Sequence, residues 1–206
     1  MKNYFIIILL AGFLFSCGKK VTVKGRVYNL IDNEGIEGVD VQLSRSKVGF
    51  FAYDGAGSKA IENTTTDQDG NYLISYRHNN RSFRLFFSVD EEQYINTEPV
   101  QYNISQQNNT IDVPLVSLSF LKLKISNVNC EDSDDEIFYQ RHWLSGNESS
   151  NGVSQFGCFD YEGEFFKVPM GAYKYTWDVT RNGVTESFEE EFYIDKGEEK
   201  VFEILY

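Results

Sequence analysis

Few side chains in this sequence are suited to metal or nucleophilic chemistry. The 206 residues include two histidines, His78 and His142, and three cysteines. Structural zinc takes about four nitrogen or sulfur ligands, and no third such residue lies beside either histidine. The sequence contains no nucleophile elbow, and no pair of Asp or Glu residues stands out as a glycosidase pair. We therefore expect no metal site, no cofactor and no enzymatic activity.

Acidic residues gather in two places that could be mistaken for cation sites. Asp67, Asp69 and Gly70 resemble the start of a calcium-binding loop, but the twelfth position, where such a loop places Glu, holds His78. We therefore interpret this segment as a hairpin turn. Five acidic residues also lie within residues 131–136. They could hold a divalent cation loosely, but a solvated loop is the expected interpretation of such a run.

The overall charge excludes one class of partner. The sequence carries 19 Lys and Arg residues against 31 Asp and Glu residues, a formal charge of −12. A nucleic-acid binder requires a basic footprint, so none is expected here. Hydrophobic residues make up 41% of the chain and aromatic residues 16%, which is enough for a folded core and argues against disorder.

The N-terminal residues have the features of an export signal. Residues 4–15 are almost wholly apolar and follow a short basic start. About 20 residues are needed to span a bilayer, so this run matches the apolar region of a signal peptide. The run ends at Leu14, Phe15, Ser16 and Cys17, which resembles the lipobox of bacterial lipoproteins, although Phe15 departs from the small residue usual there.

This resemblance implies that residues 1–16 are removed and that Cys17 becomes the first, lipidated residue. Two or more acyl chains anchor a protein stably, whereas one holds it only marginally. The alternatives are an ordinary secretory signal with a chance cysteine, or an uncleaved membrane helix. We expect a lipid-anchored protein of the bacterial cell envelope, at the outer membrane, on either its periplasmic or its surface face.

Export determines how the other two cysteines are interpreted. Cys130 and Cys158 form an even pair, and disulfides persist in oxidising compartments outside the cytosol. We predict a disulfide between them, with a free buried pair as the alternative.

The rest of the chain shows strand periodicity. Apolar residues alternate with polar ones in short runs, separated by Gly, Asn and Asp. The runs include Val21, Val23 and Val27; Val39, Val41 and Leu43; Tyr72, Ile74 and Tyr76; Phe83, Leu85 and Phe87; Leu121, Leu123 and Ile125; and Tyr173, Tyr175, Trp177 and Val179. Asn182 and Gly183 predict a two-residue hairpin turn.

This pattern predicts an all-β protein of two antiparallel β-sandwiches in tandem, at residues 17–117 and 118–206. The boundary near residue 117 is expected to separate a strand at 110–116 from one at 121–125. No Pro-rich or Ser-rich linker marks that boundary. The second sandwich is expected to be immunoglobulin-like.

The first block resembles a known family. Residues 23–27, 35–43 and 65–74 together resemble the carboxypeptidase regulatory-like domain, a transthyretin-like Greek-key sandwich. The resemblance covers roughly residues 20–116. It implies an accessory fold without catalysis of its own.

One loop in this block carries several aromatic residues. Phe50, Phe51 and Tyr53 lie beside Gly55 and Gly57 within a long insertion. These aromatic residues could form a binding tip, but we favour the alternative that they cover the open end of the sandwich.

Together these features favour a membrane-anchored, non-enzymatic protein that presents a binding or scaffolding surface in the envelope. Its expected partners are the membrane and either another envelope protein or a glycan. The alternative function is a carbohydrate-binding or peptide-binding accessory of an outer-membrane uptake complex. A hydrolase with an unrecognised site in residues 118–206 is a third hypothesis.

Overall fold

The computed structural model describes residues 19–46, 58–78, 83–96, 101–104 and 107–206. Within these residues the regular structure consists of β-strands, as the alternating pattern predicts, so the all-β fold class is confirmed. No helix long and apolar enough to cross a membrane occurs in the same residues.

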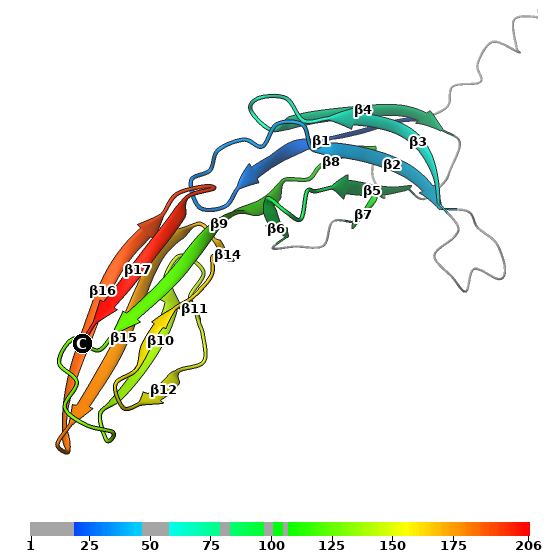
Figure 1. The fold of residues 1–206 in the computed structure, drawn as a ribbon. Coiled ribbons are helices and arrows are strands. Elements are labelled where there is room, and N and C mark those ends of the chain that lie inside the picture. The colour runs from blue at the N-terminus through cyan, green and yellow to red at the C-terminus, as the bar shows by residue number, and fades with distance from the viewer. Residues whose placement is uncertain (1–18, 47–57, 79–82, 97–100, 105–106) are drawn as a thin grey trace, which may run out of the picture. The chain divides into compact units, whose positions relative to one another are not determined.

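The described residues form two compact units, shown in Figure 1. The first contains the described residues within 1–28, 34–89 and 98–113, and the second those within 29–33, 90–97 and 114–206.

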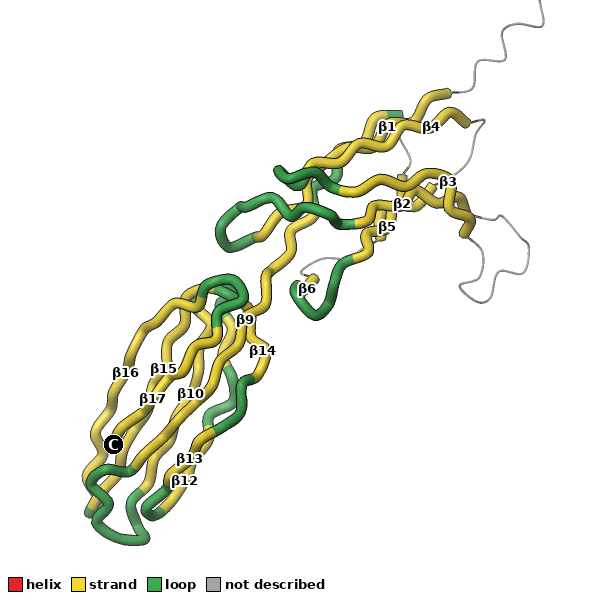
Figure 2. Tube along the Cα trace, turned by 45° about the horizontal axis from the view of Figure 1, so that its top comes forward, coloured by secondary structure: helices red, strands yellow, loops and turns green. Residues whose placement is uncertain are grey.

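The first unit is built from two layers of strands. One layer pairs β1 (Lys19–Asn29) antiparallel with β4 (Asn71–His78) and parallel with β8 (Asn108–Thr110). The other has the order β3 (Ser58–Thr65), β2 (Asp40–Ser46), β5 (Phe83–Ser88), β7 (Gln101–Ile104). Figure 2 shows β1 and β4 in one layer and β3, β2 and β5 in the other.

The core of the first unit lies between these layers. The alternating residues predicted to face inward are buried, among them Val23 and Val41, both with 0% exposure. Aromatic rings meet edge to face in the core, with the centroids of Tyr72 and Phe87 5.4 Å apart. Tight packing of this kind holds the sheets in a fixed geometry.

Two glycines in the first unit are required by their surroundings. A Cβ at Gly25 would lie 1.7 Å from the carbonyl oxygen of Ile111, so only glycine allows this close approach. Gly70 has a φ of 78° and donates its N–H to the carbonyl of Asp67 at 2.8 Å. The Asp67 carboxylate accepts the N–H of Asp69 at 3.1 Å and that of Asn71 at 2.7 Å. Asp67 is therefore a turn residue, as expected.

The second unit also contains two sheets. In one, β9 (Val113–Ser126) pairs antiparallel with β6 (Tyr94–Asn96), β13 (Asp160–Glu162) and β14 (Phe166–Pro169), and parallel with β17 (Glu199–Leu205). In the other, β10 (Glu136–Trp143) pairs with β11 (Glu148–Ser149), β12 (Val153–Phe156) and β15 (Gly171–Arg181), and β15 pairs with β16 (Val184–Ile194).

The hairpin between β15 and β16 agrees with its prediction. Asn182 and Gly183 have φ values of 50° and 74°, and Arg181 is paired with Val184 across the turn. Positive φ at both central residues is the geometry that an Asn-Gly hairpin supplies.

Strand β9 differs from the expectation. The sequence predicts separate strands at 110–116 and 121–125, but the structure has one strand of 14 residues, Val113–Ser126. It runs through residue 117 without a break, and Ser117 and Ser119 are buried within it at 0% exposure. The backbone of the two serines continues the strand ladder, with Ser117 opposite Tyr94 and Ser119 opposite Val168.

Candidate functional site

Several predicted site residues lie outside the described residues. These are Cys17, the expected lipidation site, and the loop residues Phe50, Phe51 and Tyr53. The signal peptide at residues 1–16 also lies outside them. Lipidation, signal cleavage and a binding role for the loop therefore stay predictions.

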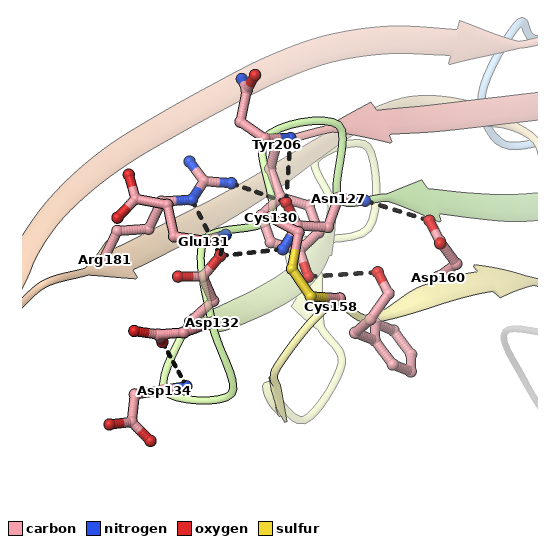
Figure 3. The surroundings of a disulfide bond; sticks show 12 residues. Asn127, Cys130, Glu131, Asp132, Asp134, Cys158, Asp160, Arg181 and Tyr206 are labelled. Carbon is pink, nitrogen blue, oxygen red and sulfur yellow. Dashed lines mark hydrogen bonds and ion pairs between the residues drawn. A yellow bond between two sulfur atoms is a disulfide. The ribbon is translucent and has the colours of Figure 1, made fainter.

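The predicted disulfide between Cys130 and Cys158 is present in the structure. It joins the loop between β9 and β10 to the loop between β12 and β13, as Figure 3 shows. The two Cα atoms lie 5.3 Å apart, within the usual range for a disulfide. The bond closes a loop whose ends are 28 residues apart in sequence.

A buried carboxylate organises the loop beside the disulfide. Asp135 is 1% exposed. Its Oδ2 accepts hydrogen bonds from the N–H of Glu131 at 3.1 Å, from Nδ2 of Asn127 at 3.2 Å and from Nε of Arg181 at 3.3 Å. The N–H of Glu131, assisted by Asn127 and Arg181, lowers the pKa of Asp135 below its ordinary value. The expectation of a fully solvated acidic loop is therefore wrong at this residue.

The other acidic residues of the loop behave as expected. Glu131, Asp132 and Asp134 are exposed, and the carboxylate of Asp132 accepts the N–H of Asp134 at 2.8 Å within a local turn. Across the described part of the chain, no three His, Cys, Asp or Glu side chains are grouped so that they could hold a metal ion.

Arg181 connects this loop to the end of the chain. Its Nη2 donates to Oδ1 of Asn127 at 3.0 Å, and its guanidinium carbon lies 5.5 Å from the centroid of the Tyr206 ring. Tyr206 is 6% exposed, and its hydroxyl donates to the carbonyl of Phe159 at 3.3 Å. Figure 3 shows Arg181, Asn127 and Tyr206 around the disulfide. The cluster joins three segments, so its polar groups serve to stabilise the unit.

The aromatic residues of the second unit divide between its core and its surface. Tyr173, Tyr175, Phe202 and Tyr206 are buried, whereas Phe138, Phe156, Tyr161, Phe165, Phe166, Phe188 and Tyr193 are exposed. The rings of Tyr175 and Phe202 are stacked with centroids 4.6 Å apart, and those of Phe192 and Phe202 are 4.7 Å apart. Burial raises the pKa of Tyr175 to about 12. Tyr173 is equally buried, at 1% exposure.

His142 also has a structural role. Its Nδ1 lies 2.8 Å from the hydroxyl oxygen of Ser149, and its Nε2 lies 3.2 Å from that of Thr176. Both ring nitrogens are therefore engaged by hydroxyl groups that connect β10 to β11 and to β15.

The outer face of the β3-β2-β5 sheet carries a hollow of about 440 Å³, which is absent from the expectations drawn from the sequence. It is lined by Asp40, Val41, Gln42, Asn63, Phe86, Phe87 and Ser88. The available signal was Phe86, which breaks the alternation of Phe83, Leu85 and Phe87 by placing an aromatic residue at an outward position.

A second hollow, of about 430 Å³, lies on the outer face of β9, β13 and β17. Its carboxylates include Glu162, which is paired with Lys122 at 2.5 Å and with Lys124 at 3.5 Å. These lysines lower the pKa of Glu162, as ordinary surface ion pairs do.

Comparison with known proteins assigns no family. No family model and no curated protein matches the chain. Among solved structures, the Bacillus anthracis TIE protein aligns with 91% of this chain and 34% of its own, at 13% identity and a TM-score of 0.40. The Streptococcal ancillary pilin aligns with 91% of this chain and 62% of its own, at 15% identity and a TM-score of 0.37.

The shaft pilin SpaA from Lactobacillus rhamnosus GG aligns with 91% of this chain and 97% of its own, at 8% identity and a TM-score of 0.37. This chain thus spans about a third of the first of these proteins. The resemblance of residues 20–116 to the carboxypeptidase regulatory-like domain stays a prediction, since no family model matches.

Proposed function

We propose that this chain is an exported, lipid-anchored, non-enzymatic β-sandwich protein that displays a binding or scaffolding surface in the bacterial cell envelope. The observation that carries the proposal is the disulfide between Cys130 and Cys158. Disulfides persist where thiols are not kept reduced, so this bond is consistent with the export signal predicted from residues 1–16.

The anchor in this proposal is Cys17, which follows the apolar run of residues 4–15. Acylation of its thiol and of the amine exposed by cleavage would hold the protein at the outer membrane through several acyl chains. The chain has a formal charge of −12, so anionic lipids would not attract it electrostatically. In this arrangement the acyl chains supply the membrane affinity.

Three described carboxyl groups have a structural role that fits this proposal. The pKa shifts resolved for them, at Asp135, Glu162 and Glu198, are all downward and arise from hydrogen bonds and ion pairs. The shifted carboxyls therefore act as structural acceptors.

The test is metabolic labelling with a palmitate analogue, followed by separation of membrane and soluble fractions. Wild-type protein is expected to carry the label and to remain in the membrane fraction, because Cys17 is acylated. Cys17→Ser is expected to lose the label. The matched control is the double variant Cys130→Ala with Cys158→Ala, which should keep it. Label that persists on Cys17→Ser would contradict the proposed anchor.

A further inference from the structure

We propose that the hollow on the outer face of the β3-β2-β5 sheet is a binding subsite for one ring of a neutral saccharide. The inference adds a ligand to the display function proposed above, but its test does not depend on lipidation of Cys17.

The hollow is formed by two rows of side chains that cross the strands. Gln42 of β2 is directly opposite Asn63 of β3 on one side and Phe86 of β5 on the other. In the neighbouring row, Asp40 is opposite Ser88. Adjacent strands lie about 4.8 Å apart and residues two apart on a strand about 6.8 Å apart, so these rows frame an area comparable to one pyranose ring.

The alternation of the strands sends these side chains away from the core. Val41 and Leu43 are buried at 0% exposure and face inward, so their neighbours Asp40 and Gln42 face the other side of the sheet. Asp40, Asn63 and Ser88 are exposed, and Phe86 is half-buried. The buried residues behind them hold this surface rigid.

The chemistry of the hollow suits a sugar. The face of an aromatic ring carries partial negative charge and attracts the C–H groups on the apolar face of a pyranose. Phe86 supplies that ring, while the carboxylate of Asp40 and the amide of Asn63 supply an acceptor and a donor for hydroxyl groups. Ligand sites typically combine apolar surface with a few convergent polar groups in a volume of about 300–1,000 Å³, and this hollow has about 440 Å³.

One of the amides is already oriented. Oε1 of Gln42 accepts a hydrogen bond from the hydroxyl of the buried Ser44 at 3.1 Å. Gln42 lines the hollow, so the N–H groups of its amide are the donors that it can offer to a ligand. A donor fixed before binding loses less entropy when the ligand arrives.

Charge selects neutral sugars over acidic ones. Asp40 brings a negative charge to the hollow, and the whole chain has a formal charge of −12. A uronic acid polymer would meet like charge at close range, which costs affinity.

The second unit carries a competing aromatic surface. A hollow of about 410 Å³ on its outer sheet face is lined by Phe138, Thr176, Trp177, Asp178, Ser187, Phe188 and Glu189, and the rings of Trp177 and Phe188 are stacked with centroids 5.7 Å apart. Phe138 is 38% exposed, so a sugar that stacks in this hollow would lose affinity in Phe138→Ala and not in Phe86→Ala. Phe138→Ala therefore distinguishes the two hollows.

The experiment is isothermal titration calorimetry of the full chain, purified in detergent, with maltohexaose, laminarihexaose, mannohexaose and xylohexaose, and with hexagalacturonic acid as the acidic probe. At least one neutral hexasaccharide is expected to bind with a Kd of about 1 mM or lower, and hexagalacturonic acid about tenfold more weakly. Phe86→Ala should weaken binding about tenfold or more, because the stacking surface is lost. Asn63→Ala should weaken it by about threefold to tenfold through one lost hydrogen bond.

Asn63 is exposed, so its variant tests the subsite without disturbing the core. Phe138→Ala should bind as the wild type does. The proposal is overturned if none of the four neutral probes binds at about 10 mM, if hexagalacturonic acid binds more tightly than all of them, or if Phe86→Ala and Asn63→Ala both leave the affinity unchanged. None of these outcomes bears on the lipid anchor, which the labelling experiment tests separately.

Discussion

Removing the disulfide should destabilise the second unit by an amount that follows from the length of the loop it closes. Cys130 and Cys158 are 28 residues apart. In the chain-entropy model, closing a loop of that size lowers the entropy of the unfolded chain by about 12 cal/mol/K, which corresponds to about 3.6 kcal/mol at 25 °C. The double variant Cys130→Ala with Cys158→Ala should lose about this much free energy of unfolding.

The two tryptophans make the effect measurable in the second unit alone. Trp143 lies in β10 and Trp177 in β15, and the chain has no other tryptophan. Urea unfolding followed by tryptophan fluorescence therefore reports this unit. The equilibrium constant for unfolding is expected to rise several hundredfold in the double variant, since about 1.4 kcal/mol corresponds to a factor of ten.

Reduction of the wild type provides the matched control. Dithiothreitol should lower the stability of the wild type to about that of the double variant, and it should leave the double variant unchanged. The reasoning is refuted if the free energy of unfolding of the double variant lies within about 1 kcal/mol of that of the oxidised wild type. The chain-entropy model would then overstate how strongly the disulfide constrains the unfolded chain.

Two further predictions concern single residues. The carboxylate of Asp135 has a folded-state pKa below its ordinary value of 3.8, so its stabilisation is present above about pH 4 and is lost as pH falls through the lower folded value. Asp135→Asn should therefore show a shallower loss of stability below pH 4 in the same fluorescence assay; identical acid profiles would count against this role. Gly70→Ala should destabilise the first unit well beyond the roughly 1–2 kcal/mol cost of a left-handed alanine, because its Cβ would lie 2.1 Å from the carbonyl oxygen of Val27. Gly38 also has a positive φ, of 79°, but a Cβ there would meet open space. Gly38→Ala should therefore lose only the roughly 1–2 kcal/mol of the left-handed conformation, as measured by calorimetry. Equal losses of unfolding free energy in Gly70→Ala and Gly38→Ala would exclude the steric argument.

Local features of the fold could be predicted because they depend on neighbours in sequence. Alternating side chains such as Tyr173 and Tyr175 point to one face of a strand whatever its partner. The turn at Asn182 and Gly183 needs only positive φ at adjacent residues. The pairing of Cys130 with Cys158 followed from counting cysteines in an exported chain.

The candidate saccharide subsite was less accessible to sequence reasoning. Its rows bring together residues of β2, β3 and β5, and the partner of Gln42 depends on which strands pair and in which register. A shift of one residue would move Phe86 to the core face. The alternation of residues 83–87 indicates that Phe86 faces outward. It does not indicate that the carboxylate of Asp40 and the amide of Asn63 lie beside Phe86.

The amino-acid sequence by itself determined the strand content, the hairpin turn and the cysteine pair, because backbone preference and side-chain alternation act over a few residues. Tertiary structure decided the rest. It made β9 continuous through Ser117, placed β17 parallel to β9, and buried Asp135 beside Arg181, 46 residues further along the chain. Charge is buried only where a partner and hydrogen bonds compensate its desolvation, and those partners are brought together by the packing of distant strands.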